Sequence, residues 1–96
     1  MAMTVIVTRD VPDRTRGFLA SIMPEPAPGV YAAGNLSRAV RERAWAVVSS
    51  WYAETRRGSV VMLWKDDRMP GGLGIEILGT PPRRLADLDG VLVSVW

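Results

Sequence analysis

Residues 60–64 read VVMLW, an unbroken run of apolar side chains. A run of this length, bounded by turn-forming and polar residues, is typical of a central strand that is buried on both of its faces. Gly58 lies just before it, and a polar loop from Lys65 to Gly72, ending in two glycines, follows it. We therefore predict a central sheet strand at residues 60–64, and the neighbouring elements are assigned outward from it.

The segment toward the N-terminus predicts two strands and one helix. Residues 4–8 read TVIVT, which is β-branched throughout and indicates a strand. A short helix is expected at residues 14–23, because its apolar residues recur at i, i+3 and i+4. Prolines end this helix, residues 30–33 form a short strand, and Gly34-Asn35 is expected to be a turn.

The longest predicted element is a helix over residues 38–56. Ser37 is a good N-cap for it, and Gly58 fits the position just beyond its C-terminus. Arg41 and the neighbouring Glu42 fall largely off the apolar stripe of this helix. That stripe has a period of about 3.6 residues and consists of Val40, Ala44, Val47, Val48, Trp51 and Tyr52.

Three further segments complete the chain. Residues 73–78 alternate well enough for a strand, residues 79–90 are expected to be a loop, and residues 91–96 form the last strand. The order is then β-α-β-α-β-β-β. Helices that cover one face of a mainly antiparallel sheet make an α+β sandwich, here in a single domain of residues 1–96.

The last strand is unusual because it ends the chain with apolar side chains, where a chain end normally frays into water. One interpretation is that it pairs inside its own sheet. The other is that it pairs across a dimer or adds to a partner protein, since an unpaired apolar edge invites strand pairing. The residues concerned are Val91, Val93, Val95 and Trp96.

The composition excludes several kinds of chemistry. The 96 residues contain no cysteine and no histidine, which excludes a disulfide framework, a thiolate zinc site and a Ser-His-Asp triad. Any hydrolysis would depend on carboxylates, hydroxyls, arginines or a hard metal ion. No apolar run approaches the roughly 20 residues of a membrane span, and no cleavable signal is visible at the start. We therefore expect a cytoplasmic protein with no membrane partner.

Arginine dominates the positive charge. The formal net charge is only +2, but eleven of the twelve basic residues are arginine. A GC-rich genome favours arginine codons, and arginine is also the side chain that best matches phosphate. Arg14 and Arg16 open a predicted helix, where free amides attract anions, and Arg83 and Arg84 lie in a proline-rich loop. Each pair is either solvated or in contact with the phosphates of a duplex, along which a dimer would repeat it.

Two aspartates follow the first strand. Asp10 and Asp13 lie just past residues 4–8, and carboxylates at a strand end can hold Mg²⁺ together with waters. Aspartate is also common in turns and at helix N-caps, so the pair alone does not define a metal site. The aspartates expected to be solvated or in salt bridges are Asp66, Asp67, Asp87 and Asp89. The tryptophans expected to pack in the core are Trp45, Trp51 and Trp64.

The chain also carries short motifs in a fixed order. It opens with VIVTRDVPDRTRG at residues 5–17, a strand followed by a V-P turn and the start of a helix. The later motifs are Pro28-Gly29-Val30-Tyr31 with Gly34, Arg41 to Trp45, Gly58 to Trp64, Arg83-Arg84 and Asp87-Leu88-Asp89-Gly90. In order and spacing, over essentially the whole chain, they resemble the subtype I-E branch of the CRISPR-associated Cas-two family.

The resemblance implies a ferredoxin-like α+β protomer that forms a homodimer. It implies that this dimer bridges two dimers of the Cas-one integrase, in the antiviral complex that captures double-stranded prespacer DNA and inserts it at the CRISPR leader end. It also implies that the C-terminal strand and the loop with Asp87 and Asp89 dock on the second copy and on Cas-one. The positions that would hold the duplex backbone are Arg14, Arg16, Arg83 and Arg84.

The family is also named for metal-dependent endonuclease activity, with an acidic residue at the end of the first strand. Arg9 stands where that branch can carry a glutamate, and Asp10 is the nearest acid, so Asp10 becomes the candidate catalytic residue and Mg²⁺ ligand. We favour an architectural DNA-binding subunit over the alternative, a Mg²⁺-dependent endonuclease acting on RNA or DNA. A third hypothesis is a small α+β homodimer that binds nucleic acid or protein without any CRISPR link.

Overall fold

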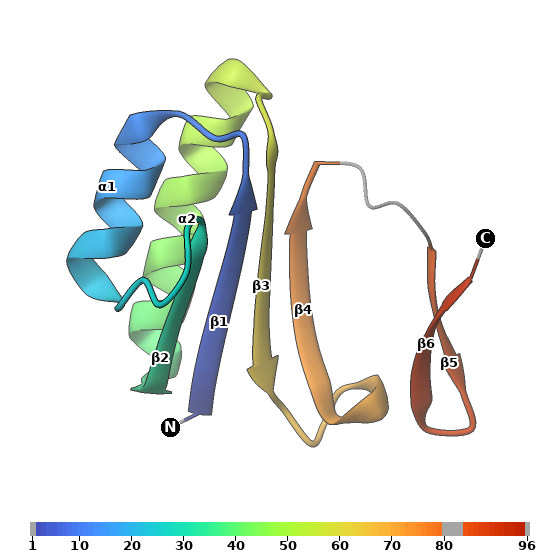
Figure 1. Cartoon of the computed structure of the whole chain (residues 1–96). Helices are drawn as coiled ribbons and strands as arrows, with labels where there is room; N and C mark the ends of the chain where they lie inside the picture. The colour runs from blue at the N-terminus through green and yellow to red at the C-terminus, as the bar shows by residue number, and fades with distance from the viewer. Residues whose placement is uncertain (1, 80–83, 96) are drawn as a thin grey trace.

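The computed structural model describes residues 2–79 and 84–95 (Figure 1). Within these residues the chain alternates strands and helices at first and then continues with strands alone. In chain order the elements are β1 (Ala2–Arg9), α1 (Asp13–Ile22), β2 (Val30–Leu36), α2 (Arg38–Thr55), β3 (Ser59–Lys65), the 3-10 helix η1 (Pro70–Gly72), β4 (Leu73–Leu78), β5 (Arg84–Leu88) and β6 (Val91–Val95).

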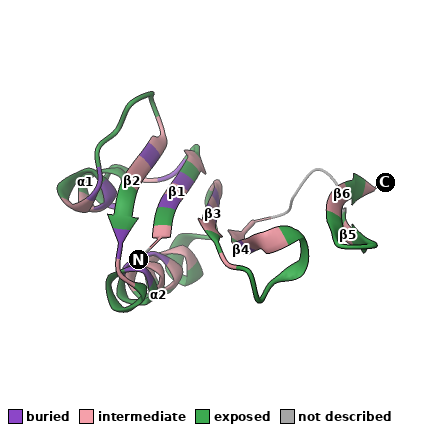
Figure 2. Ribbon diagram, turned by 90° about the horizontal axis from the view of Figure 1, so that it is seen from below, coloured by how far each residue is buried: buried purple, intermediate pink, exposed green. Residues whose placement is uncertain are grey.

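The first four strands form one sheet in the order β2-β1-β3-β4, and every neighbouring pair in it is antiparallel. Both α-helices pack against the same side of this sheet (Figures 1 and 2). The predicted α+β, ferredoxin-like fold class is therefore confirmed, and β3 has the predicted interior position between β1 and β4. Neither α-helix in the described part of the chain is long and apolar enough to cross a bilayer.

The core lies between the sheet and the helices. From the strands, Ile6, Tyr31 and Met62 are 2% exposed or less, and Leu19 and Val48 from the helices pack against them. In Figure 2 the buried residues lie on α1, α2 and the strands that they cover. This burial follows from the two periodicities of the sequence, since alternate strand residues and one stripe of each helix face the same layer.

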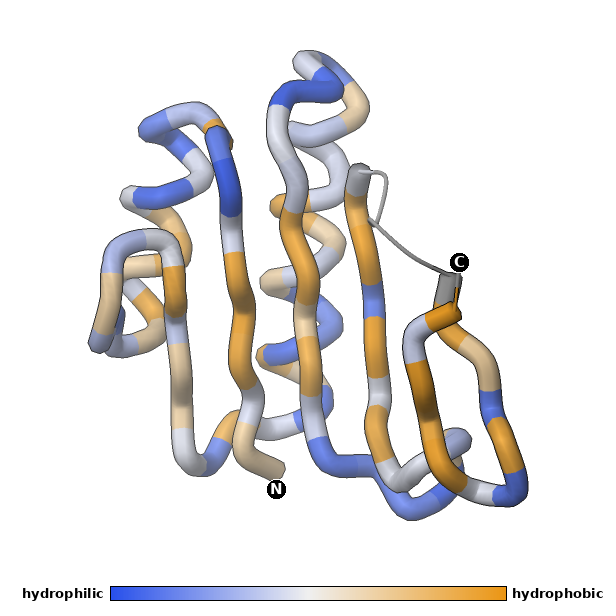
Figure 3. Tube along the Cα trace, turned by 45° about the vertical axis from the view of Figure 1, so that its right-hand side comes forward, coloured by the Kyte–Doolittle hydropathy of each residue, from blue (hydrophilic) through white to orange (hydrophobic). Residues whose placement is uncertain are grey.

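The other face of the sheet is apolar, and neither α-helix of the described residues covers it. Strand register places Val61 beside Val7 and Ile77, and Leu63 beside Val5 and Ile75, on the side away from the core. These strands appear as hydrophobic segments in Figure 3. The run at residues 60–64 is thus buried on one face in a single chain, not on both as predicted. We call this surface the open face; its apolar members are Met3, Val5, Val7, Val30, Ala32, Val61, Leu63, Ile75 and Ile77.

Two element boundaries differ from the sequence prediction, and one predicted cap is confirmed. Gly34 and Asn35 belong to β2, because that strand stays paired with β1 as far as Leu36, so the predicted turn there is wrong. Ser37 caps α2 as predicted, and its Oγ accepts a hydrogen bond from the Val40 amide at 3.2 Å. At the other end of α2 the C-cap is Arg56, with φ at 50°, so Gly58 does not follow the helix directly.

The predicted loop at residues 79–90 contains a strand. Residues 84–88 form β5, which pairs with β6 in an antiparallel hairpin, so the last strand pairs inside its own chain but outside the main sheet. Asp89 and Gly90 connect the two strands with φ of 52° and 84°, the left-handed conformations of a tight two-residue turn. The hairpin lies beyond β4 (Figure 1), and Leu92 packs against Gly71 of η1.

Gly58 fixes how the end of β1 meets the start of β3. Its φ is +78°, and a Cβ at this position would overlap the carbonyl oxygens of Arg9 and Asp10. We predict that Gly58→Ala lowers the free energy of unfolding by about 2 kcal/mol or more, because the left-handed conformation alone costs an L-residue roughly 1–2 kcal/mol. Urea denaturation followed by circular dichroism measures this loss.

Gly17→Ala is the matched control. No atom lies within 4 Å of a Cβ at this exposed position of α1, and alanine favours a helix over glycine. We expect this variant to gain about 0.5–1 kcal/mol of stability. Equal effects of the two substitutions would contradict the role assigned to Gly58.

Candidate nucleic-acid interface

Three segments of the chain meet where β1 ends. They are the turn at Asp10, the start of α1 and the connection from α2 to β3. Asp10 has φ at 56°, a left-handed conformation that turns the chain out of the strand. Gly58 leaves room for this turn, since no residue with a Cβ fits so close to the Asp10 carbonyl. An aspartate and a glycine thus set the N-terminus of α1 at this end of the sheet.

Arg14 is turned toward α2. Its Nη2 lies 2.7 Å from Oε2 of Glu54, and its guanidinium stacks 4.2 Å from the ring centroid of Trp51. Trp51 in turn meets Phe18 of α1 edge to face, at 5.5 Å between ring centroids. Trp51 is therefore half-buried between the helices, where it packs against Phe18 and also orients Arg14. Arg14 itself remains exposed, so a phosphate can replace Glu54 as its partner.

Arg16 has different surroundings. It lines a cavity of about 290 Å³ together with Asp10, Asp13 and Arg57. Its backbone carbonyl accepts a hydrogen bond from the Tyr31 hydroxyl at 3.4 Å, which ties the first turn of α1 to β2. Burial raises the pKa of the Tyr31 phenol, so the hydroxyl stays protonated and remains a donor at neutral pH. Arg14 and Arg16 thus lie at the same end of the sheet but on different sides of α1.

The carboxylates at this end of the sheet lie beside a guanidinium. Asp10 and Asp13 line the same cavity, but Oδ1 of Asp10 lies 3.7 Å from Nη2 of Arg57. A cation bound to Asp10 would have to displace that guanidinium or share the carboxylate with it. Among residues 2–79 and 84–95, no three acidic side chains come close enough to hold one ion. Asp10 is thus one member of an exposed ion pair, and Asp10 and Asp13 are the carboxylates that the described residues would offer to Mg²⁺ in this cavity.

A family model described as CRISPR-associated protein (Cas_Cas2CT1978) matches residues 3–93. The chain belongs to this CRISPR-associated family. The match covers both α-helices, the main sheet and most of the hairpin. It confirms the resemblance at the level of a Cas-two-like family, so the hypothesis of a small homodimer without any CRISPR link no longer applies. The subtype I-E assignment stays a prediction.

The C-terminal residues of this CRISPR-associated chain lie in the hairpin. Asp87 is in β5, and its Oδ1 accepts a hydrogen bond from the Gly90 amide at 2.9 Å, so it stabilises the turn that contains Asp89. Val91 is 61% exposed, whereas Val93 and Val95 are half-buried. Of the remaining predicted residues, Arg84 begins β5, and Arg83 and Trp96 lie outside the described residues.

The other aspartates and tryptophans behave largely as predicted. Asp67 pairs with Lys65, and Asp66 accepts from Nε of Arg68 at 3.2 Å, so both are salt-bridge partners. Hydrogen bonds from the Arg68 side chain and backbone amide lower the pKa of Asp66, which stays ionised. Trp45 and Trp64 pack against the core, as expected.

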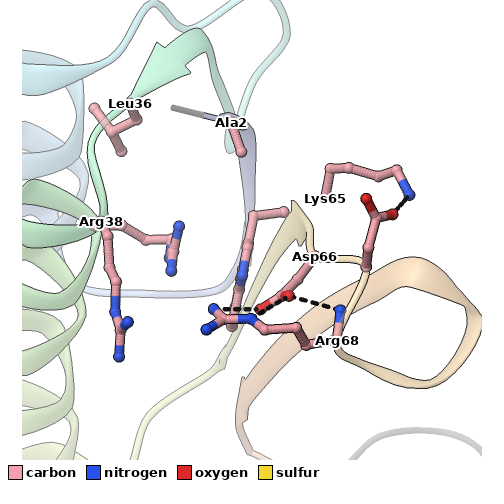
Figure 4. Close-up of a pocket in the computed structure, with 9 residues that line it drawn as sticks. Ala2, Leu36, Arg38, Lys65, Asp66 and Arg68 are labelled. Carbon is pink, nitrogen blue, oxygen red and sulfur yellow. Dashed lines mark hydrogen bonds and ion pairs between the residues drawn. The ribbon is translucent and has the colours of Figure 1, made fainter.

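Sequence reasoning missed a second cluster of basic side chains, at the opposite end of the sheet (Figure 4). Arg41 was expected off the apolar stripe of α2, but it is only 8% exposed, while Val40, expected on that stripe, is 39% exposed. The sequence did offer one signal for this cluster, because the first turn of this helix contains basic residues and no acidic one. The cluster consists of Arg38, Arg41, Lys65 and Arg68 around a cavity of about 630 Å³.

Proposed function

We propose that this CRISPR-associated protein is an architectural DNA-binding subunit of a spacer-acquisition complex, of the subtype I-E kind. In this role a homodimer joins Cas-one integrase dimers in the cytosol and holds the prespacer duplex between them. The observation that carries the proposal is the family match over residues 3–93. Three features of the structure support it: the open face, the arginines at the end of β1 and the C-terminal hairpin.

The open face supports a homodimer. Burying one Val, Leu or Ile side chain contributes about 1.5–3 kcal/mol, and this face presents a continuous set of them over four strands. Large exposed apolar patches on soluble domains mark interaction surfaces. A second copy of the same sheet, facing the first, would cover it and would bury the run at residues 60–64 on both sides.

The arginines at the end of β1 support a contact with the duplex backbone. Arg14 and Arg16 are exposed, lie in the first turn of α1 and have guanidinium groups that match phosphate oxygens. The free amides of that turn add to the attraction for an anion. In a dimer each protomer would supply one pair of these arginines. In the proposed complex, Arg83 and Arg84 extend the contact with the duplex backbone.

The hairpin supports docking on the integrase. Leu88 and Val91 flank its turn and are 58% and 61% exposed, so an apolar tip projects at the end of the chain. Within the described residues, β5 and β6 form a two-stranded sheet, whose outer edges can pair with a strand of another chain. We assign the integrase contact to this hairpin, including Asp87, Asp89, Val91, Val93 and Val95, with Trp96 following.

The alternative function is a Mg²⁺-dependent endonuclease with Asp10 as the catalytic carboxylate. Its support is the cavity that Asp10 shares with Asp13 and Arg16. The ion pair with Arg57 weakens it, because that guanidinium competes with a metal for Asp10. We therefore keep the endonuclease as the second candidate.

Arg16→Gln should weaken duplex binding by the complex with the integrase. Removal of one phosphate contact per protomer lowers the slope of log affinity against log salt by about 0.9 for each such contact. Fluorescence anisotropy with a short labelled duplex over a salt series measures both the affinity and the slope.

Arg43→Gln is the control, because Arg43 is exposed on α2, lines neither cavity described above and carries the same charge. An Arg16→Gln complex that binds DNA with unchanged affinity and slope would refute the contact at α1. A decrease in Arg43→Gln as large as that in Arg16→Gln would show a general charge effect instead.

Cleavage assays separate the two candidate functions. With Mg²⁺ and either RNA or DNA, we expect wild type and Asp10→Asn to show the same background cleavage, because Arg57 occupies the Asp10 carboxylate. EDTA-sensitive cleavage by wild type that Asp10→Asn abolishes, and that Asp13→Asn retains, would instead establish the endonuclease.

A further inference from the structure

Arg41 is a largely buried cation with no carboxylate within ion-pair distance among the described residues. It is only 8% exposed, yet it forms none of the ion pairs or side-chain hydrogen bonds found there. Its guanidinium stacks 4.4 Å from the ring centroid of Trp64, which orients the group but does not neutralise it. Arg38, and to a smaller extent Arg41, lowers the pKa of the neighbouring Glu42, but no ion pair joins Arg41 to this carboxylate, so an anion at the guanidinium would supply a direct partner.

The cavity beside Arg41 is electropositive. Four basic side chains and two acidic ones line it, and we call it the α2 pocket: Ala2, Leu36, Arg38, Arg41, Trp64, Lys65, Asp66, Asp67 and Arg68. Figure 4 shows Arg38 on one side of this space and Lys65, Asp66 and Arg68 on the other. Arg68 is held by Asp66 and Lys65 by Asp67, and Arg38 pairs with Glu42 of its own helix. Among the described residues, Arg41 is therefore the basic side chain of the pocket that forms no ion pair, although Glu42 and Glu76 line a second cavity with it.

The start of α2 adds to the attraction for an anion. The Val40 amide is bonded to Ser37, whereas the amides of Arg38 and Ala39 have no acceptor among the described residues. These free donors give the helix N-terminus a partial positive charge, which favours anions and disfavours cations. Yet the first turn of α2 has no acidic residue, and Arg38 and Arg41 lie at this end. The Arg38–Glu42 ion pair and the two aspartates of the pocket offset part of this positive charge, and an anion in the pocket would offset more of it.

We propose that the α2 pocket binds a phosphate group of a nucleic-acid backbone. Guanidinium forks and free helix-end amides both match the oxygens of a phosphate, and Arg41 supplies a guanidinium that forms no ion pair among the described residues. The pocket lies at the N-terminal end of β1, about 25 Å from Arg14 and Arg16 by the length of an eight-residue strand. It is thus a second phosphate site at the far end of the sheet. That the phosphate belongs to nucleic acid rests on the proposed function, whereas binding of phosphate itself does not.

A titration with inorganic phosphate tests the pocket directly. The full chain, labelled with ¹⁵N, is titrated with sodium phosphate at constant ionic strength and pH. We expect saturable shifts at the Arg38 and Ala39 amides and at the Trp64 indole, fitted separately from any shifts at the start of α1. Absence of saturable shifts, or equal shifts with acetate, would overturn the assignment to phosphate.

Two variants keep the test independent of folding. Arg41→Gln removes the buried charge, and Arg68→Gln removes an exposed charge from the rim of the pocket. Both should weaken phosphate binding at least severalfold, while Arg43→Gln, an exposed position outside the pocket, should leave it unchanged. If Arg41→Gln fails to fold, the phosphate affinity of Arg68→Gln tests the pocket instead. A folded variant of either kind that binds phosphate as tightly as wild type overturns the proposal.

A duplex titration decides the source of the phosphate. For the complex with the integrase, Arg41→Gln or Arg68→Gln should lower the salt slope by about 0.9 for each phosphate that the variant no longer binds, in addition to the effect of Arg16→Gln. Phosphate binding without any effect on the duplex would refute nucleic acid as the source. A wild-type complex that binds no duplex would refute the proposed function. The phosphate titration would still show whether the α2 pocket binds phosphate.

Discussion

Backbone pairing holds β1 and β3 side by side in the middle of the sheet, and in such strands alternate side chains must point to opposite faces. The helices cover one face and bury Ile6, Val60 and Met62 there. The same pairing places Val5, Val7, Val61 and Leu63 on the other face, which the two helices leave uncovered. No local rearrangement can bury these residues, because a shift of register by one residue would expose the core instead. On the proposed function, a second copy of the chain covers this face.

Much of this fold could be predicted from patterns within short stretches. The β-branched run at residues 4–8, the apolar run at residues 60–64 and the Ser37 cap each have a local physical cause, and the structure contains them all. The β5–β6 hairpin was also locally encoded, since Asp89-Gly90 between apolar residues favours a two-residue turn. Its proline-rich neighbours led to the wrong prediction of a loop.

The site was less predictable, because it depends on contacts between distant segments. Nothing near Arg14 in the sequence identifies Trp51 and Glu54 as its partners, and nothing near Asp10 identifies Arg57. Likewise, the helical period alone puts Val40 on the apolar stripe and Arg41 off it. The structure reverses this because Trp64 of β3 offers a ring for the guanidinium and thus buries it. A charged side chain on a helix is buried only where tertiary structure supplies such a surface.

The two ends of the sheet can then be understood together. At one end the arginines of α1 surround the turn at Asp10, and at the other Arg41 lies in the α2 pocket. Both ends stand at the first turn of a helix, where free amides favour anions. In a chain of a CRISPR-associated family, this arrangement suits a module that positions a duplex by its backbone. It does not require the module to cut the duplex.

Sedimentation velocity of the purified chain and of Val61→Glu tests the central claim, that two copies join through the open face. The account predicts a dimer for wild type at micromolar concentration and a folded monomer for Val61→Glu, because a carboxylate in that interface would be desolvated without a partner. Ala46→Glu, which adds the same charge at an exposed position of α2, should remain a dimer. A monomeric wild type, or a Val61→Glu variant that dimerises as wild type does, would contradict it.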